Sequence, residues 1–414
     1  MKVGFNARLL ADSNLRGWNR YTVNLLAELP ALGVTPVLYG DKPFHPSHLA
    51  RLPEGSYQSR VEAVRPYVLW EQFWLPKQCA RDGVALLHAP ANFGLPWFSH
   101  CPRVLTLHDA IDSGGLWRSN KPEITFRFAS PSAFRVPRVV LAPCLRMDDR
   151  GNHGASTTRG TRAGGSWRSA FFHATARKRA HRVITVSVHA RDEIIALLNV
   201  PAKKMRVIPE AADPIFLRPS SDEDRQRVRL CYAIHAPYLF YVGGWEERKN
   251  LPFLIQAFAA ADLPGVKLVL AGGRDHEREA MRNAYPLGDR LHLLGRVDEN
   301  DLPALYAEAL AFVYPSKHEG FGLQLCEAMA VGCPVFAARA TSLPEVLGSG
   351  GLTFGLDAIA ELAELLRRVD ADRSFRDDLV SRGRLRSRDF SWRQTAEATV
   401  KVYQELMETT RSGR

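Results

Sequence analysis

Residues Tyr314 to Glu345 read YPSKHEGFGLQLCEAMAVGCPVFAARATSLPE, and this stretch decides the predicted fold. An apolar run at 309–314 predicts a strand, and the glycine-bearing turn after it predicts a loop. Apolar residues at helical spacing follow, and a second short strand is predicted at 334–337. Strand, loop, helix and strand in this order are typical of a parallel α/β sheet.

Two carboxylates stand on this unit at a spacing of eight residues. Glu319 lies in the predicted loop, and Glu327 lies about two turns into the helix because a helical turn takes 3.6 residues. We therefore expect both side chains at the same mouth of the sheet. Gly320 and Gly322 would let backbone amides approach a ligand, and the helix start would offer unpaired N–H groups to an anion.

The composition is that of a globular chain large enough for two domains. It has 414 residues, 46% of them hydrophobic and 24% charged, and no apolar run reaches the ~20 residues that a membrane-spanning helix needs. No signal peptide is recognisable, so we expect a cytoplasmic location. Six scattered cysteines without a C-x-x-C pair predict reduced thiols and argue against a structural zinc site.

The positive charge is concentrated in one segment. Residues 113–168 hold nine Arg and one Lys against three acids, a net charge of +7 out of +11 for the chain. The folded domains therefore carry little excess charge, which argues against a nucleic-acid-binding face. This segment has neither helical nor strand periodicity, so we predict that it is irregular. We interpret it as an insertion or as a locally shifted reading frame.

The first half alternates strands with helices around two candidate ligand positions. Predicted strands at 2–6, 35–39, 85–88 and 104–107 accompany helices at 20–29 and 67–77. Gly17, in the predicted loop 11–19, is either a turn residue or a point of close approach to a ligand. His108 and Asp109 follow a strand directly, where they would either bind a ligand or cap the neighbouring elements.

After the irregular segment the alternation resumes. We predict a basic helix at 171–180, strands at 182–186 and 205–208, and a helix between them that is capped by Ser187. A proline-rich linker is expected at 213–221. The second half repeats the pattern, with strands at 238–242, 267–270 and 291–294, helices at 251–261 and 302–309 and after Asp275, and a long C-terminal helix at 391–407.

Two cations follow the glycine turn of the second half. Arg248 and Lys249 stand between a strand end and a helix start, where they would hold a diphosphate or simply be solvated. The nearby carboxylate unit favours phosphate binding. Asp370 and Asp372 form a D-x-D, but they join two predicted surface helices, so we interpret them as helix caps and predict no metal site.

These motifs, taken together, resemble the Glu-x7-Glu region of the retaining glycosyltransferases of family 4. Glu319-Gly-Phe-Gly-Leu with Glu327 carries the resemblance, between Pro315-Ser316 and Leu343-Pro344-Glu345. Supporting phrases are Arg16-Gly17 with Arg20-Tyr21, His108-Asp109, Val186-Ser187, Tyr241-Val242-Gly243 with Arg248-Lys249-Asn250, and Leu294-Gly295-x-Val297. The resemblance covers the chain except about residues 113–168.

The resemblance implies a GT-B fold, that is, two Rossmann-like doubly wound domains that face each other across a cleft. An acceptor-side domain is expected at 1–212, a nucleotide-sugar domain at 222–390, and a helix that crosses back to the first domain at 391–414. The implied reaction is metal-independent, needs no cofactor, and moves a hexose from a nucleotide-diphosphate sugar.

The resemblance also implies a role for each matched residue. Glu327 would bind the ribose, Glu319 and the backbone of Gly320, Phe321, Gly322 and Leu323 would hold the donor sugar, and Arg248 and Lys249 would neutralise the diphosphate. Gly17 would approach the diphosphate from the other domain, His108 would contact the sugar, and Gly243 and Val297 would complete the donor site. Glu319 would act as a positioning and electrostatic group, because retention in this family is described as front-face attack.

The phrases around Arg248 and Glu345 favour GDP-mannose as donor, and the family acts on glycans or lipid-linked acceptors in surface polysaccharide synthesis. The basic stretch 177–182 would either touch an acidic membrane at its inner face or be a solvated helix face. Gln324 replaces a usual proline, which the first helical turn should tolerate. The irregular segment replaces the usual acceptor-side helix and would impair acceptor binding if the frame is shifted.

Two other classes of function stay open at this point. A catalytically impaired sugar-nucleotide-binding homologue would keep Glu327 and the cations yet fail to transfer. A dinucleotide oxidoreductase would need a G-x-G-x-x-G after a strand, which the sequence lacks. A phosphorylase of the same fold would need a lysine-bound cofactor, for which we see no specific sign.

Overall fold

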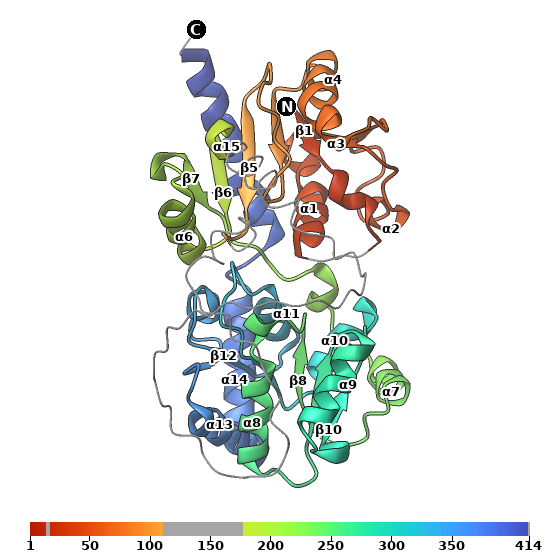
Figure 1. Ribbon diagram of the computed structural model, residues 1–414, viewed down its shortest axis with the longest axis vertical. Helices are drawn as coiled ribbons and strands as arrows, with labels where there is room; N and C mark the ends of the chain where they lie inside the picture. The colour runs from red at the N-terminus through yellow and green to blue at the C-terminus, as the bar shows by residue number, and fades with distance from the viewer. Residues whose placement is uncertain (14–16, 111–176, 413–414) are drawn as a thin grey trace, which may run out of the picture.

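The computed structural model describes residues 1–13, 17–110 and 177–412, and it contains two parallel sheets, one above the other in Figure 1. The N-terminal sheet has seven strands in the order β3-β2-β1-β4-β5-β6-β7. Its strands are β1 (Lys2–Asn6), β2 (Thr35–Gly40), β3 (Gln58–Val61), β4 (Leu86–Ala89), β5 (Arg103–Leu107), β6 (Arg182–Thr185) and β7 (Met205–Val207). All of the pairings are parallel.

The C-terminal sheet has six parallel strands in the order β10-β9-β8-β11-β12-β13. They are β8 (Tyr238–Val242), β9 (Lys267–Ala271), β10 (Leu291–Leu293), β11 (Ala311–Tyr314), β12 (Val335–Ala338) and β13 (Leu352–Phe354). Both sheets reverse their strand order once, which is the doubly wound topology in which ligands bind beyond the carboxyl ends of the strands. The predicted fold class, two Rossmann-like doubly wound sheets, is confirmed.

Helices cover the faces of both sheets. Those of the N-terminal part are α1 (Gly17–Glu28), α2 (Pro46–Leu49), α3 (Tyr67–Leu69), a π-helical turn (Trp70–Trp74), α4 (Leu75–Arg81) and α6 (Val188–Leu198). The C-terminal part has α7 (Asp222–Cys231), α8 (Leu251–Ala261), α9 (Asp275–Ala284), α10 (Leu302–Ala307), α11 (Leu323–Val331), α12 (Leu343–Leu347), α13 (Ile359–Ala371) and α14 (Arg373–Ser387). No helix in these ranges, or in the rest of the described chain, is long and apolar enough to span a bilayer.

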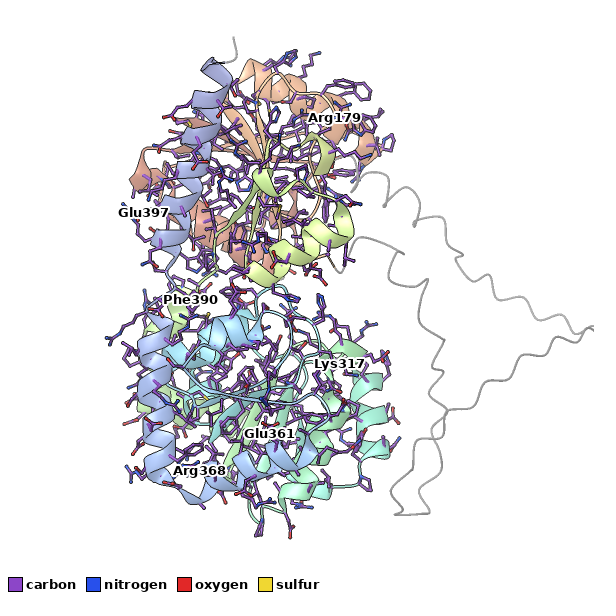
Figure 2. All side chains as sticks on the ribbon, turned by 90° about the vertical axis from the view of Figure 1, so that its left-hand side faces the viewer. Arg179, Lys317, Glu361, Arg368, Phe390 and Glu397 are labelled. Carbon is purple, nitrogen blue, oxygen red and sulfur yellow. The ribbon has the colours of Figure 1, made fainter. Side chains whose placement is uncertain are left out.

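The last helix, α15 (Trp392–Ser412), lies along the N-terminal sheet (Figure 1). Its Trp392 and Tyr403 are buried in the same apolar cluster as Tyr21 of α1. The Tyr403 hydroxyl is 2.6 Å from Nδ1 of His88 in β4. Phe390, just before this helix, stands at the junction of the two parts of the molecule in Figure 2.

Central strands are continuous apolar runs because they are buried on both faces. Leu239, Phe240 and Tyr241 of β8 have no exposed surface, and the predicted bounds of β1, β8 and α8 agree with the structure. Asp372 caps α14 as predicted, since its carboxylate accepts the Phe375 N–H at 2.9 Å. The five cysteines in the described ranges are free thiols.

Several predicted elements differ from the structure. Helix α1 begins at Gly17 instead of at residue 20, so this glycine is no loop residue. The aromatic stretch 67–77, predicted as one helix, is interrupted by the π-helical turn, in which Trp70 is fully buried and Phe73 is 68% exposed. The linker expected at 213–221 contains a 3-10 turn, Pro214–Leu217, in which Phe216 is 1% exposed and Leu217 is 64% exposed. Strands β3 and β13 and helices α7 and α12 were not predicted.

The irregular segment predicted at 113–168 lies outside the described residues, together with most of the helix predicted at 171–180. The sixth cysteine, Cys144, also lies outside the described residues, and so does Arg16, which was quoted for the family resemblance. The hypothesis of an insertion or a shifted frame therefore stays a prediction.

Candidate active site

Loops from both sheets meet where the carboxyl ends of their strands face each other. His108 follows β5, Arg248 and Lys249 lie in the 3-10 turn Glu247–Lys249 after β8, and Glu319 follows β11. Strand β11 is the neighbour of β8 in the sheet, so the second and third loops are adjacent. This is the position at which open α/β sheets bind ligands.

The Glu319 carboxylate collects four hydrogen bonds on one oxygen, Oε1. Lys249 Nζ donates at 2.5 Å and Arg248 Nη1 at 3.1 Å. The hydroxyls of Ser316 and Tyr314 donate at 2.5 and 3.0 Å. We call these five residues the Glu319 centre. The sequence predicted the acid and both cations at one site, and the structure brings them together.

The charges of the centre depend on one another. Burial raises the pKa of Glu319, but Lys249 and Arg248 outweigh it and hold that pKa below its usual value. Burial lowers the pKa of Lys249, and Glu319 opposes this effect. The two cations also differ in access, because the side chain of Arg248 is 34% exposed and that of Lys249 only 6%. Arg248 is therefore the cation that a ligand reaches first.

The loop that carries Glu319 is fixed by its own backbone. Ser342 Oγ donates to the carbonyls of Glu319 and Phe321, at 3.0 Å in both cases. Gly322 has φ of +96°, a left-handed conformation that favours glycine, and it is the N-cap residue of α11, where it offers no side-chain cap. The first N–H groups of α11 thus lack a capping side chain.

Gly320 is required by a contact between the two sheets. A Cβ at this position would lie 2.0 Å from the carbonyl oxygen of His108. Its own carbonyl accepts a hydrogen bond from Ser187 Oγ at 2.6 Å. We had predicted that this glycine opens the loop to a ligand; in the structure the space that it leaves is filled by the loop after β5.

Glu327 belongs to a second centre, which we call the Glu327 centre. It is 1% exposed, its Oε1 accepts from Arg20 Nη1 of α1, and its Oε2 accepts from the Tyr306 hydroxyl at 3.3 Å. Arg20 also lies 3.5 Å from a carboxylate oxygen of Glu299 and 4.0 Å from one of Asp213. The structure therefore does not bring Glu327 into the Glu319 centre, and it pairs this acid across the two sheets.

Burial dominates the electrostatics of this second centre. It raises the pKa of Glu327 to about 7, although the charge of Arg20 acts in the opposite direction. For Arg20 itself, burial lowers the pKa, but Glu327, Glu299 and Asp213 outweigh it and raise the pKa. Near neutral pH the Glu327 carboxyl is thus close to its titration point, while Arg20 stays charged.

His108 is held on both sides of its ring. Nδ1 is 2.8 Å from Oε1 of Glu210 and Nε2 is 3.0 Å from the carbonyl oxygen of Pro90. Burial lowers the pKa of His108, but the bond to Glu210 and its charge outweigh this and raise it. Two acceptors on two ring nitrogens are satisfied together by an imidazolium ion. The ring packs edge-to-face on Tyr21, with centroids 4.8 Å apart.

The remaining predicted site residues are spread around these centres. Gly17 is the first residue of α1, and Gly243 follows β8 directly, where its N–H donates to the Ala271 carbonyl at 3.3 Å. The Phe321 ring packs on Phe390, and Val297 is a buried residue of the C-terminal core. Leu323 begins α11. The side chains of Phe321 and Val297 thus belong to the hydrophobic core, so only their backbone groups are available to a ligand.

Further contacts join the two sheets next to the Glu319 centre. The Glu345 carboxylate accepts the N–H groups of Val188 and His189, at 2.8 and 3.2 Å, at the start of α6. A carboxylate of the C-terminal part therefore occupies the positive end of a helix of the N-terminal part. Sequence reasoning quoted Glu345 within the family phrase but assigned it no role.

Sequence reasoning also missed the partners that come from distant segments. Glu210 was not noted, although an acid directly beyond a strand at the same sheet edge as His108 is a usable signal. Arg20 was quoted within the family resemblance without a role. Ser187 was predicted only as a helix cap, which is confirmed because its Oγ accepts the Ala190 N–H at 3.0 Å. Among the described residues, one group of side chains could hold a metal ion: His189, Glu193 and His318.

Comparison with known proteins covers both parts of the chain. Residues 15–216 match the family described as Glycosyltransferase Family 4, and residues 231–386 match the family described as Glycosyl transferases group 1. The chain is 35% identical over 236 residues to the O-antigen chain mannosyltransferase B of Escherichia coli, a region that covers 55% of this chain and 61% of that protein.

A second curated relative is the MMP alpha-(1->4)-mannosyltransferase of Mycolicibacterium hassiacum, 29% identical over 54% of each chain. The chain thus spans less than two thirds of the length of either relative. Among solved structures, Anabaena Alr3699/HepE in complex with UDP and glucose superposes with a TM-score of 0.66 and 19% identity, over 100% of both chains. At this identity the superposition shows the shared fold.

Proposed function

The chain belongs to the group 1 glycosyltransferases of family 4, and from this premise we propose that it moves a hexose from a nucleotide-diphosphate sugar to a glycan or lipid-linked acceptor, with retention at the anomeric carbon. The proposed donor is GDP-mannose. Two similar curated proteins are mannosyltransferases, and one of them acts on the O-antigen chain, which supports mannose and surface polysaccharide synthesis.

The observation that carries the proposal is the convergence of Arg248 and Lys249 on Glu319 at the carboxyl edge of the sheet. In sugar transfer the bond between the anomeric carbon and a phosphate oxygen breaks, and negative charge develops on the departing diphosphate. Preorganised cations stabilise such a charge without reorganisation of solvent. Arg248, the more exposed cation, would contact the phosphates.

Lys249 has a different role in this proposal. It is nearly buried and donates to Glu319 and to the Tyr314 hydroxyl, at 2.5 and 2.7 Å. We assign it to orienting the Glu319 carboxylate, with its charge adding to that of Arg248. Glu319 would then hold the donor sugar beside the anomeric carbon while the acceptor hydroxyl attacks from the leaving-group side and transfers its proton to the departing phosphate oxygen.

The ribose of the donor is assigned to Glu327. Because this carboxylate has both oxygens engaged, by Arg20 and Tyr306, ribose hydroxyls would have to replace part of the Arg20 contact. Donor binding would therefore loosen a bond between the two sheets. His108 would act on the sugar through its positive charge and its backbone carbonyl, since both of its ring nitrogens are bonded to the protein.

The proposed donor site is completed by backbone groups, which belong to Gly17, Gly243, Gly320, Phe321, Gly322, Leu323 and Val297. The uncapped N–H groups at the start of α11 would face the anionic donor, in the way that helix N-termini bind phosphate. No cofactor is part of this proposal. We keep the predicted division of the chain as its framework. The acceptor domain is 1–212, the donor domain is 222–390, and the helix that returns to the first domain is 391–414.

A membrane-facing surface for the acceptor is proposed on the N-terminal part. Phe73 and Phe98 are 68% and 74% exposed and line a hollow of about 800 Å³ together with Lys77, Arg81 and Arg179. The Arg179 guanidinium lies 5.8 Å from the Phe98 ring centre, and Figure 2 labels Arg179 on the N-terminal part. Exposed aromatic rings among cations suit an anionic lipid surface, at the inner face of the membrane.

Co-sedimentation with lipid vesicles tests this surface. We expect the wild-type protein to bind anionic vesicles. We expect less binding when Phe73 and Phe98 are both changed to Ser. Equal sedimentation of the variant, or no vesicle binding, would contradict it.

A thermal-shift panel of nucleotide sugars tests the donor. Ligand at 100 times its dissociation constant stabilises a protein by about 2.7 kcal/mol, so the true donor should raise the melting temperature by several degrees. GDP-mannose is expected to give the largest shift, and no shift with any nucleotide sugar would overturn the donor site. Donor hydrolysis is then measured, because binding without turnover would identify the catalytically impaired homologue instead.

A further inference from the structure

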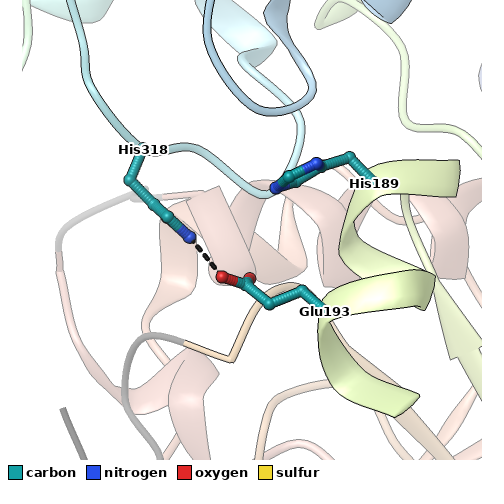
Figure 3. Close-up of side chains that lie close together, drawn as sticks. All are labelled: His189, Glu193 and His318. Carbon is teal, nitrogen blue, oxygen red and sulfur yellow. Dashed lines mark hydrogen bonds and ion pairs between the residues drawn. The ribbon is translucent and has the colours of Figure 1, made fainter. Parts of the chain in front are cut away.

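Three metal-ligating side chains from the two parts of the molecule converge beside the proposed active site (Figure 3). His189 and Glu193 stand four residues apart on α6, so they project from the same helix face one turn apart. His318 comes from the loop between β11 and α11. One ligand atom from each residue lies within 4.8 Å of the other two.

We propose that His189, Glu193 and His318 form a binding site for a divalent transition metal of the zinc class, which links the two sheets. Two imidazole nitrogens and one carboxylate oxygen are ligands that Zn²⁺ prefers, at about 2.0–2.2 Å from the metal. Tetrahedral geometry at that radius separates ligand atoms by about 3.3 Å. Side-chain adjustments of about 1 Å would bring the three atoms to that spacing.

The protein alone satisfies these three side chains only in part. Glu193 Oε1 and His318 Nε2 are 2.6 Å apart, which is their mutual hydrogen bond. His318 Nδ1 is buried and has no hydrogen-bond partner among the described residues. The His189 ring lies edge-on to that of His318, with centroids 6.3 Å apart. A metal ion would use donor capacity that the described part of the chain leaves open.

The place of the site gives it a consequence for the active site. His318 precedes Glu319, and its backbone carbonyl accepts from Arg248 Nη1 at 3.1 Å and from Ser316 Oγ at 3.3 Å. Metal binding would therefore tie the Glu319 loop to α6, beside the Ser187 to Gly320 bond that already joins the sheets. Three protein ligands leave a fourth position for water. Metal binding itself does not depend on the proposed sugar transfer.

Isothermal titration of chelator-treated wild-type protein with Zn²⁺ alone tests the site. We expect saturable binding of one ion per chain, and at least tenfold weaker binding in His189→Ala and in His318→Ala. His276→Ala, which removes an exposed histidine of α9 away from the cluster, is the matched control and should bind like the wild type. Absence of saturable binding would overturn the proposal, and so would stoichiometric binding that both cluster variants retain.

A second readout uses the wild-type protein alone and so does not depend on the folding of the variants. Co²⁺ bound by two imidazoles, a carboxylate and water in tetrahedral geometry gives intense visible absorption. The wild-type protein should develop these bands at one equivalent of Co²⁺, and Zn²⁺ should displace them. If the protein shows only the weak absorption bands of octahedral Co²⁺, as in the hydrated ion, the result would contradict a three-ligand site.

Discussion

The two glutamates of one motif sit in opposite environments. Glu319 has two cations and two hydroxyls from its own part of the chain, within about 70 residues, and its pKa is held low. Glu327, eight residues later, is paired with a cation from the other part, 307 residues away, and its pKa is raised to about 7. One carboxylate is fixed as an anion within a local centre, and the other depends on how the two sheets meet.

The difference teaches that the two acids of one motif make two different kinds of contact in this structure. The Glu319 centre is built by adjacent loops of one sheet, so all five of its residues come from the C-terminal part. The Glu327 centre exists only where Arg20 reaches across. A ligand that binds at both acids would therefore couple the donor to the arrangement of the two sheets.

The largest effect is expected when Arg20 is removed. Arg20→Met leaves Glu327 buried without its cation, and breaking a buried pair in this way costs about 3–5 kcal/mol. The loss of unfolding free energy, measured by urea at pH 8.5 where Glu327 is ionised, should be of that order. It should shrink at pH 6, where Glu327 takes up a proton. A loss that is equal at both pH values would contradict the pairing.

A smaller effect, on turnover, is expected at the Glu319 centre. Glu319→Gln keeps the shape but removes the negative charge that is proposed to hold the donor sugar beside the anomeric carbon. Removal of one preorganised electrostatic group commonly lowers kcat by about 10²–10³. Donor hydrolysis rates of the two proteins provide the measurement, with Glu308→Gln, an acid on the far side of the C-terminal part near Arg229, as the control. Turnover within a factor of two of the wild type would remove Glu319 from the reaction.

The pH dependence of stability should carry the signature of Glu327. Its pKa is about 7 in the folded chain, above the 4.5 of a free glutamate, so the folded state binds the proton more tightly. This contribution is fully present below pH 4.5 and is lost as the pH rises through 7, by about 3 kcal/mol in total. The stability of wild type relative to Glu327→Gln should therefore fall between pH 5 and 8; a difference that rises with pH would refute the raised pKa.

The smallest effect is expected at Gln324. This residue is the second of α11, where proline is tolerated, and its side-chain oxygen accepts from the Tyr314 hydroxyl at 3.2 Å. Gln324→Pro should change the unfolding free energy by less than about 1 kcal/mol, because the loss of one hydrogen bond is offset by a stiffer unfolded chain. A loss well above 2 kcal/mol in urea unfolding would show that the loop before α11 differs from this account.

Patterns within short stretches made much of this structure predictable from sequence. Strand β8 and helix α8 were predicted with their observed bounds, because a continuous apolar run and a periodic helix need no distant partner. Arg248 and Lys249 were assigned next to Glu319 because all three stand at the carboxyl ends of neighbouring strands. The edge strands β3 and β13 were missed, since three or four residues, half of them exposed in β3, give little pattern.

What could not be predicted depends on how the two sheets meet. Arg20 and Glu327 are far apart in the chain, and so are Glu193 and His318, at 125 residues. The sequence analysis attributed Gly320 to the close approach of a ligand, although in the structure the carbonyl oxygen of His108 fills the space beside this glycine. No local spacing encodes such contacts, because they arise only where the two parts of the molecule meet.

The most direct test of the central claim compares two ligands on two variants. If Glu327 binds the ribose and Glu319 the sugar, Glu327→Gln should weaken GDP and GDP-mannose by the same factor, about tenfold for one charged hydrogen bond. Glu319→Gln should weaken GDP-mannose and leave GDP as tight as before. Calorimetric titration that finds both variants affected alike, or an unchanged affinity of Glu327→Gln for GDP, would contradict this division of roles.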